Sequence, residues 1–314
     1  MKYFKLWLAL VSLLSSSAIA STHTLYAGQY QEIGSVETTY MGLLLTVEAT
    51  ITEPGWCLVK SHLYVGDTAP ESSSPGQFPY SHDLGCSVSD TYMIDVSAND
   101  QYVAYHAEAV ETAFPIGGDP NFTVGPGSES YFEAAIDGGG SYPAWCIDLA
   151  HSISYGTTYT DCELRSILDV DLPWVYLPEN LPYVQWIINQ DWSELLPGSS
   201  WQDIQGALWK LTQPTPPENA AGGINWNEEN ALAIVDMAMI AVDDFGVGDT
   251  QLLVMQCKSG NTLKQTTLIA IGMSIEEFFI AEETAWSAGD SFWYNRKGKQ
   301  IGWGSYWLEF RETE

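Results

Sequence analysis

Alternation between apolar and polar side chains is the feature that most limits the fold of this chain. Between residues 43 and 52 the apolar side chains fall on one face of an extended segment and the polar ones on the other: Leu43, Leu45, Val47, Ala49 and Ile51 against Thr46, Glu48, Thr50 and Thr52. A period of two is typical of a strand with one buried face. Turn signals such as Glu53-Pro54-Gly55 separate further alternating runs up to about residue 110. This part of the chain is therefore expected to form a β-sandwich.

The first twenty residues have the composition of an export signal. Lys2 and Lys5 precede an apolar run from Leu6 to Leu14, and Ala18-Ile19-Ala20 is a small-residue cleavage pattern. We therefore expect residues 1–20 to be a signal peptide and the protein to be secreted or associated with the cell surface. No later segment has the roughly 20 uninterrupted apolar residues that span a bilayer, so no transmembrane segment is expected.

Acidic residues greatly outnumber basic ones. The net charge is −29, and it falls by a further two when the lysines of the signal are removed. Such a surface repels nucleic acid, so we expect no nucleic-acid partner. The carboxylates are spread along the chain, which favours a role in solubility. Structural calcium is the sharper alternative, with two candidate groups of oxygen ligands: Asp95, Asn99 and Asp100, and Asp243 with Asp244.

The sequence lacks the motifs of the common enzyme classes. Its five histidines occur singly, without the His-x-x-x-His spacing of a metal site, and no Gly-x-Ser-x-Gly elbow marks a serine hydrolase. We therefore expect no enzyme, no metal and no cofactor, and we interpret His62, His82 and His106 as structural. Forty acidic residues leave glycosidase chemistry open. The tryptophans at 293, 303 and 307 are candidates for a carbohydrate-binding face.

The middle of the chain contains glycine-rich loops followed by helices. Ser199 or Ser200 is placed to cap a helix that carries Ile204 and Leu208 on one stripe, and prolines at 214, 216 and 217 prevent its extension. A shorter helix is expected near residues 184–189. The stretches 252–255 and 266–271 have strand composition. The expected fold class is therefore mainly β with a few helices.

A further helix is expected from about Asn227 to Phe245, where Gly246 is placed to end it. Acidic residues occupy its first turn, which suits the positive end of a helix dipole. The spacing predicts one stripe of side chains facing the core: Leu232, Val235, Met239 and Val242.

Cys146 and Gln205 stand in two motifs that together suggest one reactive site. Cys146 lies in the segment Ala144-Trp145-Cys146-Ile147-Asp148, and Gln205 lies beside the apolar stripe of the capped helix. A thiol held against a primary amide can displace ammonia and form an internal thioester, which an amine can then attack. Proximity of the two groups can supply on the order of 7 to 11 kcal/mol of the acceleration. The sequence thus predicts Cys146 as the thiol and Gln205 as the acyl donor.

An exported chain with five cysteines leaves one of them over. Cys57 and Cys86 flank one compact, turn-rich segment and are the expected local pair. Among Cys146, Cys162 and Cys257, three different bridges remain open. Cys146 can pair with Cys162, or it can be a buried free thiol.

Several short segments resemble a β module that is common in secreted microbial surface proteins: Tyr26-Ala27-Gly28-Gln29, Trp56, residues 62–66 and 75–80, and His106-Ala107. In such proteins a Glu-Thr-Ala-Trp segment and an aromatic strand follow soon after His-Ala. Here Glu111-Thr112-Ala113-Phe114 follows His106, but Glu283-Thr284-Ala285-Trp286 precedes the aromatic run at 303–307. The resemblance implies an insertion, in which residues 21–115 with 275–314 form the sandwich module and residues 116–274 form a second domain. A linear order of two domains is the competing interpretation.

Three segments of the middle region resemble the thioester domains of bacterial surface adhesins: residues 145–148, 184–190 and 203–209. In that family an aromatic-Cys strand motif and a helical apolar-Gln-x-apolar-apolar motif form the bond. The resemblance implies an α+β thioester-type domain in which Cys146 is the thiol and Gln205 the acyl donor. Asp203, Trp145 and Trp209 would support the site.

The same resemblance implies an adhesin-like protein that captures an amine-bearing surface protein or polymer. With Cys146 engaged in a thioester, Cys162 would pair with Cys257. The alternative is a noncovalent extracellular protein, structural or carbohydrate-binding, that uses the same scaffold and forms no thioester.

Overall fold

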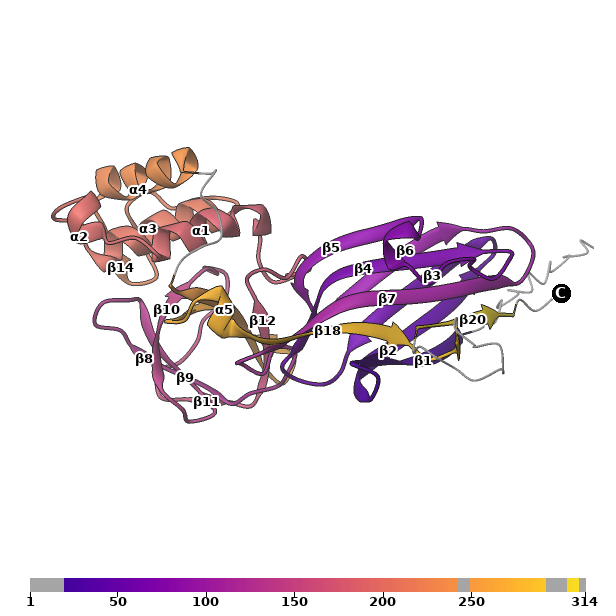
Figure 1. Cartoon of the computed structure of the whole chain (residues 1–314). Coiled ribbons are helices and arrows are strands. Elements are labelled where there is room, and N and C mark those ends of the chain that lie inside the picture. The colour runs from indigo at the N-terminus through magenta and orange to yellow at the C-terminus, as the bar shows by residue number, and fades with distance from the viewer. Residues whose placement is uncertain (1–19, 242–248, 292–303, 311–314) are drawn as a thin grey trace, which may run out of the picture.

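The computed structural model describes residues 20–241, 249–291 and 304–310. Two β-rich lobes lie end to end, and helices cover the sheet of only one of them (Figure 1). The expected fold class, mainly β with a few helices, is confirmed. The expected signal peptide lies outside the described residues apart from Ala20, which begins the first strand. No helix in the described part of the chain is long and apolar enough to cross a membrane.

The first lobe is a ten-stranded antiparallel sheet that folds over itself as a sandwich. Its strand order is β19-β20-β7-β18-β1-β2-β3-β6, with β4 beside β7 and β5 beside β4. The strands are β1 (Ala20–Ala27), β2 (Gln31–Met41), β3 (Leu44–Ile51), β4 (Trp56–Gly66), β5 (Tyr80–Ser87), β6 (Ser89–Asp95), β7 (Gln101–Thr112), β18 (Phe279–Ser287), β19 (Asp290–Ser291) and β20 (Ser305–Glu309). A short 3-10 turn, Pro75–Gln77, precedes β5.

The sandwich core follows from the alternation in the sequence. In β3, Leu45, Val47 and Ala49 are buried while the side chains between them reach the surface or its margin. Leu43, expected on the same face, lies in the preceding turn and is 54% exposed. The bridge between Cys57 and Cys86 joins β4 to β5 and confirms the expected local pair.

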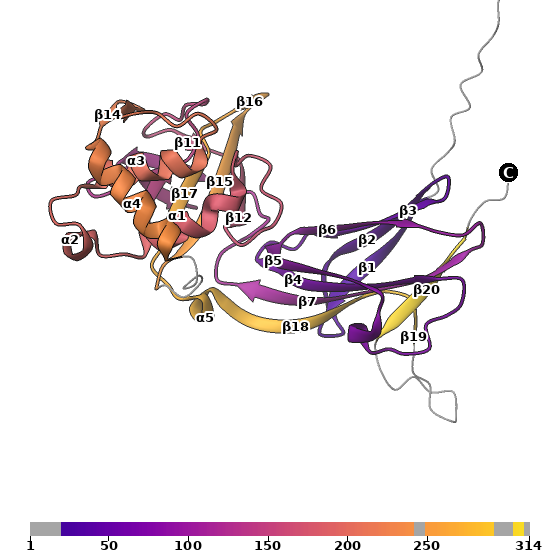
Figure 2. The same cartoon turned by 90° about the horizontal axis from the view of Figure 1, so that it is seen from above.

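Strand β18 brings the C-terminal part of the chain into the sheet formed by the N-terminal strands. It pairs with β7 on one side, where Ala285 lies opposite Ala107, and with β1 on the other. Further along the same edge of β7, β20 places Trp307 opposite Val103 (Figure 2). Segments before residue 113 and after residue 278 therefore share one sheet. This order supports an insertion, and the division of the chain into two domains stays a prediction.

The second lobe is built on an eight-stranded sheet in the order β11-β8-β9-β10-β17-β15-β12, with β16 beside β15. Cys162 lies directly opposite Cys257 in the pairing of β12 with β15, and the two form a disulfide. The expected second bridge is thus confirmed, and Cys146 keeps a buried free thiol. The strands are β8 (Phe122–Pro126), β9 (Phe132–Ile136), β10 (Ser141–Cys146), β11 (Thr158–Tyr159), β12 (Asp161–Ser166), β15 (Gln251–Ser259), β16 (Thr262–Leu263) and β17 (Thr267–Ile271).

Helices α1 to α4 gather on one side of this second sheet, whereas α5 lies apart from them at the start of β18 (Figures 1 and 2). The helix that bears Gln205 begins after Ser200, as expected, and ends before the prolines. The helices are α1 (Leu181–Ile188), α2 (Trp192–Leu195), α3 (Trp201–Thr212), α4 (Glu228–Ile240) and α5 (Ile275–Phe278), and a 3-10 turn, Pro178–Asn180, leads into α1. A two-stranded hairpin, β13 (Ala220–Ala221) and β14 (Ile224–Asn225), connects α3 to α4.

The prediction of which face of α4 is buried was wrong. Leu232 is 46% and Met239 55% exposed, whereas the buried side chains are Ala231, Ile234 and Ala238. Helix α4 packs against α3 and α1, and small side chains let two helix backbones approach closely, which a stripe of large side chains does not. The expected Val242 and Gly246 lie outside the described residues.

Candidate functional site

Cys146 is the last residue of β10, in the interior of the second lobe. It lies opposite Thr267 of β17, and its side chain is fully buried. Beyond Cys146 the chain leaves the sheet, so the N–H and C=O groups of this end of the strand need partners from elsewhere in the fold.

Gln205 supplies those partners from α3. Its Oε1 accepts a hydrogen bond from the Cys146 backbone N–H at 3.0 Å, and its Nε2 donates to the Cys146 carbonyl oxygen at 2.7 Å. Gln205 is itself fully buried. The two predicted residues therefore meet, although 59 positions separate them in the sequence.

Gln213, just past the end of α3, repeats the arrangement. Its Nε2 donates to the Ile147 carbonyl oxygen at 2.6 Å, and its Oε1 accepts from the Leu149 N–H at 3.4 Å. Two glutamine side chains thus act as a neighbouring strand for residues 146–149. They fix the backbone from which the thiol projects.

A different glutamine contacts the thiol itself. Gln265, which precedes β17, donates from Nε2 to the Cys146 Sγ at 2.8 Å and to the Asp148 carbonyl oxygen at 2.9 Å. The Sγ also accepts from Trp209 Nε1 at 3.3 Å and donates to the Asp148 carbonyl oxygen at 3.2 Å. The sequence interpretation missed Gln265. The one signal for it was its position directly before the expected strand at 266–271.

Burial raises the pKa of the Cys146 thiol to about 12. Hydrogen bonds with Trp209 and with the Asp148 backbone act in the opposite direction, and the Asp148 charge adds to the rise. The thiol is therefore protonated at neutral pH. Since the thiolate is the reactive and metal-binding form of cysteine, the protonated thiol is a weak nucleophile.

Aromatic side chains wall off the thiol. Trp209 is fully buried, and the rings of Tyr131 and Trp226 lie 5.5 and 5.4 Å from it between centroids. Gly206, the residue after Gln205, lets Trp226 reach the helix, because an added Cβ there would lie 2.7 Å from the Trp226 ring. Rings packed this closely keep water from the sulfur.

The β13–β14 hairpin covers the outer side of this wall. Tyr131 donates from its hydroxyl to the Gly222 carbonyl oxygen, and an added Cβ on Gly222 would lie 2.9 Å from the Trp209 ring. Gly222 also has a φ of +55°, a backbone conformation that favours glycine. Burial raises the pKa of Tyr131 well above its usual value, with the nearby Cys146 as a further cause.

Asp203, one of the expected supporting residues, caps two helices. Its Oδ2 accepts from the N–H of Ser200 at 2.9 Å, which begins α3, and its Oδ1 accepts from the N–H of Asn227 at 2.7 Å, which begins α4. The Asn230 side chain adds a further bond at 3.1 Å. In the described part of the chain Asp203 makes no hydrogen bond to the thiol, so its effect on the site is through the placement of α3.

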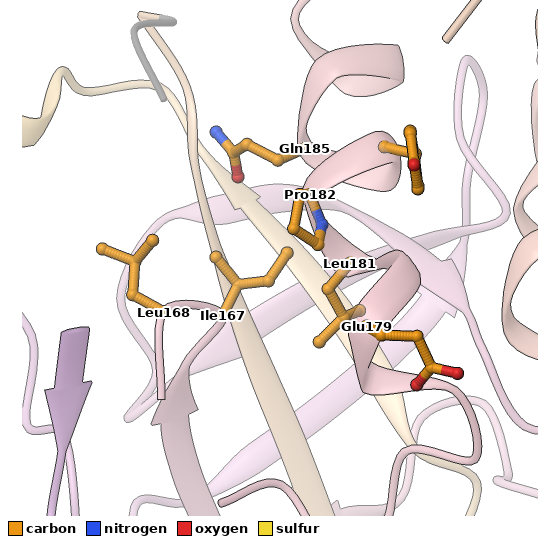
Figure 3. A pocket seen from close by; sticks show the side chains of 7 residues that line it. Ile167, Leu168, Glu179, Leu181, Pro182 and Gln185 are labelled. Carbon is orange, nitrogen blue, oxygen red and sulfur yellow. The ribbon is translucent and has the colours of Figure 1, made fainter. Parts of the chain in front are cut away.

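Trp145, another expected supporting residue, points away from the sulfur. It lines a cavity of about 270 Å³ together with Ile187, Trp192 and Ile204. Its Nε1 has no hydrogen-bond partner among the described residues. A separate cavity of about 310 Å³ lies between the loop after β12 and the start of α1, with Gln185 and Ile167 at its wall (Figure 3). Neither cavity is lined by Cys146.

The other candidate sites gain little from the structure. Within residues 20–241, 249–291 and 304–310, no group of three or more His, Cys, Asp or Glu side chains is placed to hold a metal ion. Trp307 is buried and stacks on His23 at 4.2 Å, so it offers no open face to a sugar. Trp293, Trp303 and the pair Asp243 and Asp244 lie outside the described residues.

Comparisons with protein-family models, curated proteins and solved structures gave no match.

Proposed function

We propose that the second lobe forms an internal thioester at Cys146 and that the protein uses it to capture amines covalently. In the forming step the Cys146 Sγ attacks the side-chain amide carbon of a glutamine. The S–C bond forms, the C–N bond breaks, and the thiol proton leaves with the nitrogen as ammonia. Proximity of this kind can supply on the order of 7 to 11 kcal/mol of the acceleration.

Two amides compete for the role of acyl donor, and the geometry favours Gln265 over the expected Gln205. The observation that supports this choice is the 2.8 Å contact between Gln265 Nε2 and the Cys146 Sγ. Gln205 instead binds the Cys146 N–H and C=O. In a strand the side chain stands out of the plane of those groups, so an amide bound to them lies off the path of the thiol. Gln205 then positions the nucleophile.

The surroundings suit a stored electrophile. Buried rings shield the sulfur from water, and hydrogen bonds hold the thiol and the amide in place before reaction. The partner would be an amine-bearing surface protein or polymer, and the role that of an adhesin. Two disulfides are compatible with a secreted or cell-surface location.

Intact mass tests this function. With the bond, the protein is one ammonia lighter than its sequence after both disulfides are counted, and methylamine adds to it. A Cys146→Ala variant is expected to show neither property. Wild-type protein of full sequence mass that takes up no methylamine would rule the thioester out.

Peptide mapping after methylamine treatment identifies the acyl donor. Reaction leaves a glutamine side chain one methylene heavier and releases the thiol of Cys146. We expect this label at Gln265. A label at Gln205 would restore the sequence-based assignment and reverse the roles of the two amides.

A noncovalent extracellular protein is the second candidate. It is favoured by the fact that Cys146 is fully buried and that its thiol already bonds to Asp148, Trp209 and Gln265. On that view the thiol is a core residue, and the same mass measurement returns the full sequence mass.

A further inference from the structure

Asp148 links both halves of the proposed bond through its backbone. Its carbonyl oxygen accepts from the Cys146 Sγ at 3.2 Å and from Gln265 Nε2 at 2.9 Å. Its carboxylate is close enough for its charge to raise the pKa of the Cys146 thiol. Any group fixed by this carboxylate is therefore fixed relative to the reacting atoms.

The carboxylate of Asp148 is buried and has three partners. Its Oδ1 accepts from the Ala150 N–H at 2.8 Å, and its Oδ2 from the Thr266 N–H at 3.4 Å. The third partner is His151, whose Nδ1 lies 2.7 Å from Oδ2. The bonds from the Ala150 and Thr266 N–H groups already hold the conformation of this loop. The hydrogen bond with the His151 imidazole is therefore additional to those that shape the loop.

This contact fixes the tautomer of His151. An ionised carboxylate only accepts hydrogen bonds, so Nδ1 carries the proton and Nε2 of the neutral ring presents a lone pair. The His151 side chain is 35% exposed, and its Nε2 has no hydrogen-bond partner in the described part of the chain. Thr266, which precedes β17, and Gln213, which follows α3, bond to this loop and are uncharged. Among the contacts described, Asp148 is the charged group bonded to the ring.

Capture of an amine requires a proton to move. The attacking nitrogen must lose a proton as the new amide forms, and the sulfur needs one as it leaves. A buried thiol with a pKa of about 12 makes a poor leaving group as the bare thiolate. A positioned side chain that titrates near neutral pH can meet both needs.

We propose that Asp148 and His151 form the proton-transfer pair for amine capture. The amine nitrogen bonds to the acyl carbon, His151 Nε2 accepts its proton, the C–S bond breaks, and the proton passes to the sulfur. The products are an amide and the Cys146 thiol. This inference rests on the proposed thioester. It assigns the proton transfer to His151, the first histidine after β10.

The test uses His151→Asn in the full chain. The asparagine amide can still donate to Asp148 but has no group in place of Nε2. We expect the variant to keep the mass deficit of one ammonia and to take up methylamine about 100-fold more slowly. At a constant concentration of free amine, the wild-type rate should rise as a histidine deprotonates, and the variant rate should not.

A matched control exists in the other lobe. His82 Nδ1 lies 2.7 Å from Asp90 Oδ1, and its side chain is 43% exposed beside a buried carboxylate. His82→Asn should leave both the rate and its pH dependence unchanged.

The outcomes separate the two proposals. Full sequence mass in the wild type removes the thioester itself. A mass deficit with equal rates in wild type and His151→Asn removes only the role of His151. Loss of the deficit in His151→Asn also overturns that role, since the ring would then serve formation of the bond. A wild-type profile without a histidine step overturns it whether or not the variant folds.

Discussion

At the scale of single residues, His106 of β7 makes the stability of the sandwich depend on pH. The ring is buried edge-on to Trp286 at 4.8 Å, and its Nδ1 has no hydrogen-bond partner among the described residues. Burial first, and the charge of neighbouring His62 second, lower its pKa from 6.5 to about 3. Between these two pKa values the His106 ring is therefore protonated in the unfolded chain and neutral in the folded one.

The sign of the effect follows from this lowered pKa. The stability that His106 provides is complete above pH 6.5 and is lost as the pH falls toward about 3. At roughly 1.4 kcal/mol per pKa unit, the free energy of unfolding should fall by a few kcal/mol across that window. Urea denaturation of wild type and His106→Phe at several pH values checks this. Acidification should lower the free energy of unfolding of the wild type more than that of His106→Phe. The same dependence on pH in both proteins would contradict the prediction.

The other buried contacts at residue scale could not be anticipated from neighbours in the sequence. Gln265 is separated by 119 positions from Cys146, and its position directly before an expected strand does not by itself indicate a contact with the thiol. Only the pairing of β17 with β10 brings the two together. Gln205, in contrast, lies on a helix whose cap and stop signals could be read directly.

At the scale of elements, Asp203 sets where two helices begin. It accepts from backbone N–H groups at the starts of both α3 and α4 and from the Asn230 side chain. Asp203→Ala removes a cap and leaves buried donors unpaired. We expect it to lower the free energy of unfolding by about 2–4 kcal/mol.

The same variant should impair the reactive site, because α3 positions Gln205. Urea denaturation gives the stability, and methylamine uptake gives the effect on the site. Asp191→Ala is the control, since Asp191 caps only the short α2 through Ser193, and its loss should be smaller. Equal losses of stability in the two variants would show that a cap shared by two helices stabilises the fold no more than a cap on one helix.

Elements were predictable to different degrees for physical reasons. Strand β3 has one buried face, so the period of two locates it. Helix α3 is located by its N-terminal capping residue and by the prolines that follow it. Helix α4 contacts two other helices, and its buried face is chosen by close packing of Ala231 and Ala238, which a count of large apolar residues misses. The short α2 and α5 are defined by caps within loops, below the length at which periodicity is visible.

At the scale of the whole molecule, each lobe has its own covalent staple. The Cys57–Cys86 bridge spans 29 residues within the sandwich, and the Cys162–Cys257 bridge spans 95 within the second sheet. In the chain-entropy account a longer loop gives more stability, about 3.6 kcal/mol for the first bridge and about 4.7 for the second.

Paired Cys→Ser variants test this for each bridge. Loss of Cys162–Cys257 should cost about 1 kcal/mol more than loss of Cys57–Cys86, measured by denaturation of the oxidised proteins. It should also reduce methylamine uptake, since β15 pairs with β17 beside the thiol. The sandwich bridge should leave uptake unchanged. The reverse order of the two losses would contradict the loop-length argument.

The position of β18 between β7 and β1 has a consequence for how the protein is made. A chain that emerges from its N-terminus first presents β1 and β7 before β18 exists, and all of β8 to β17 must follow in between. Until then these two strands have unpaired edges, which are prone to join other chains. Sandwich completion is a late, long-range step. The lobe whose synthesis begins first is therefore the last to be completed, and the unpaired edges of β1 and β7 stay open to aggregation at least until β18 has been synthesised.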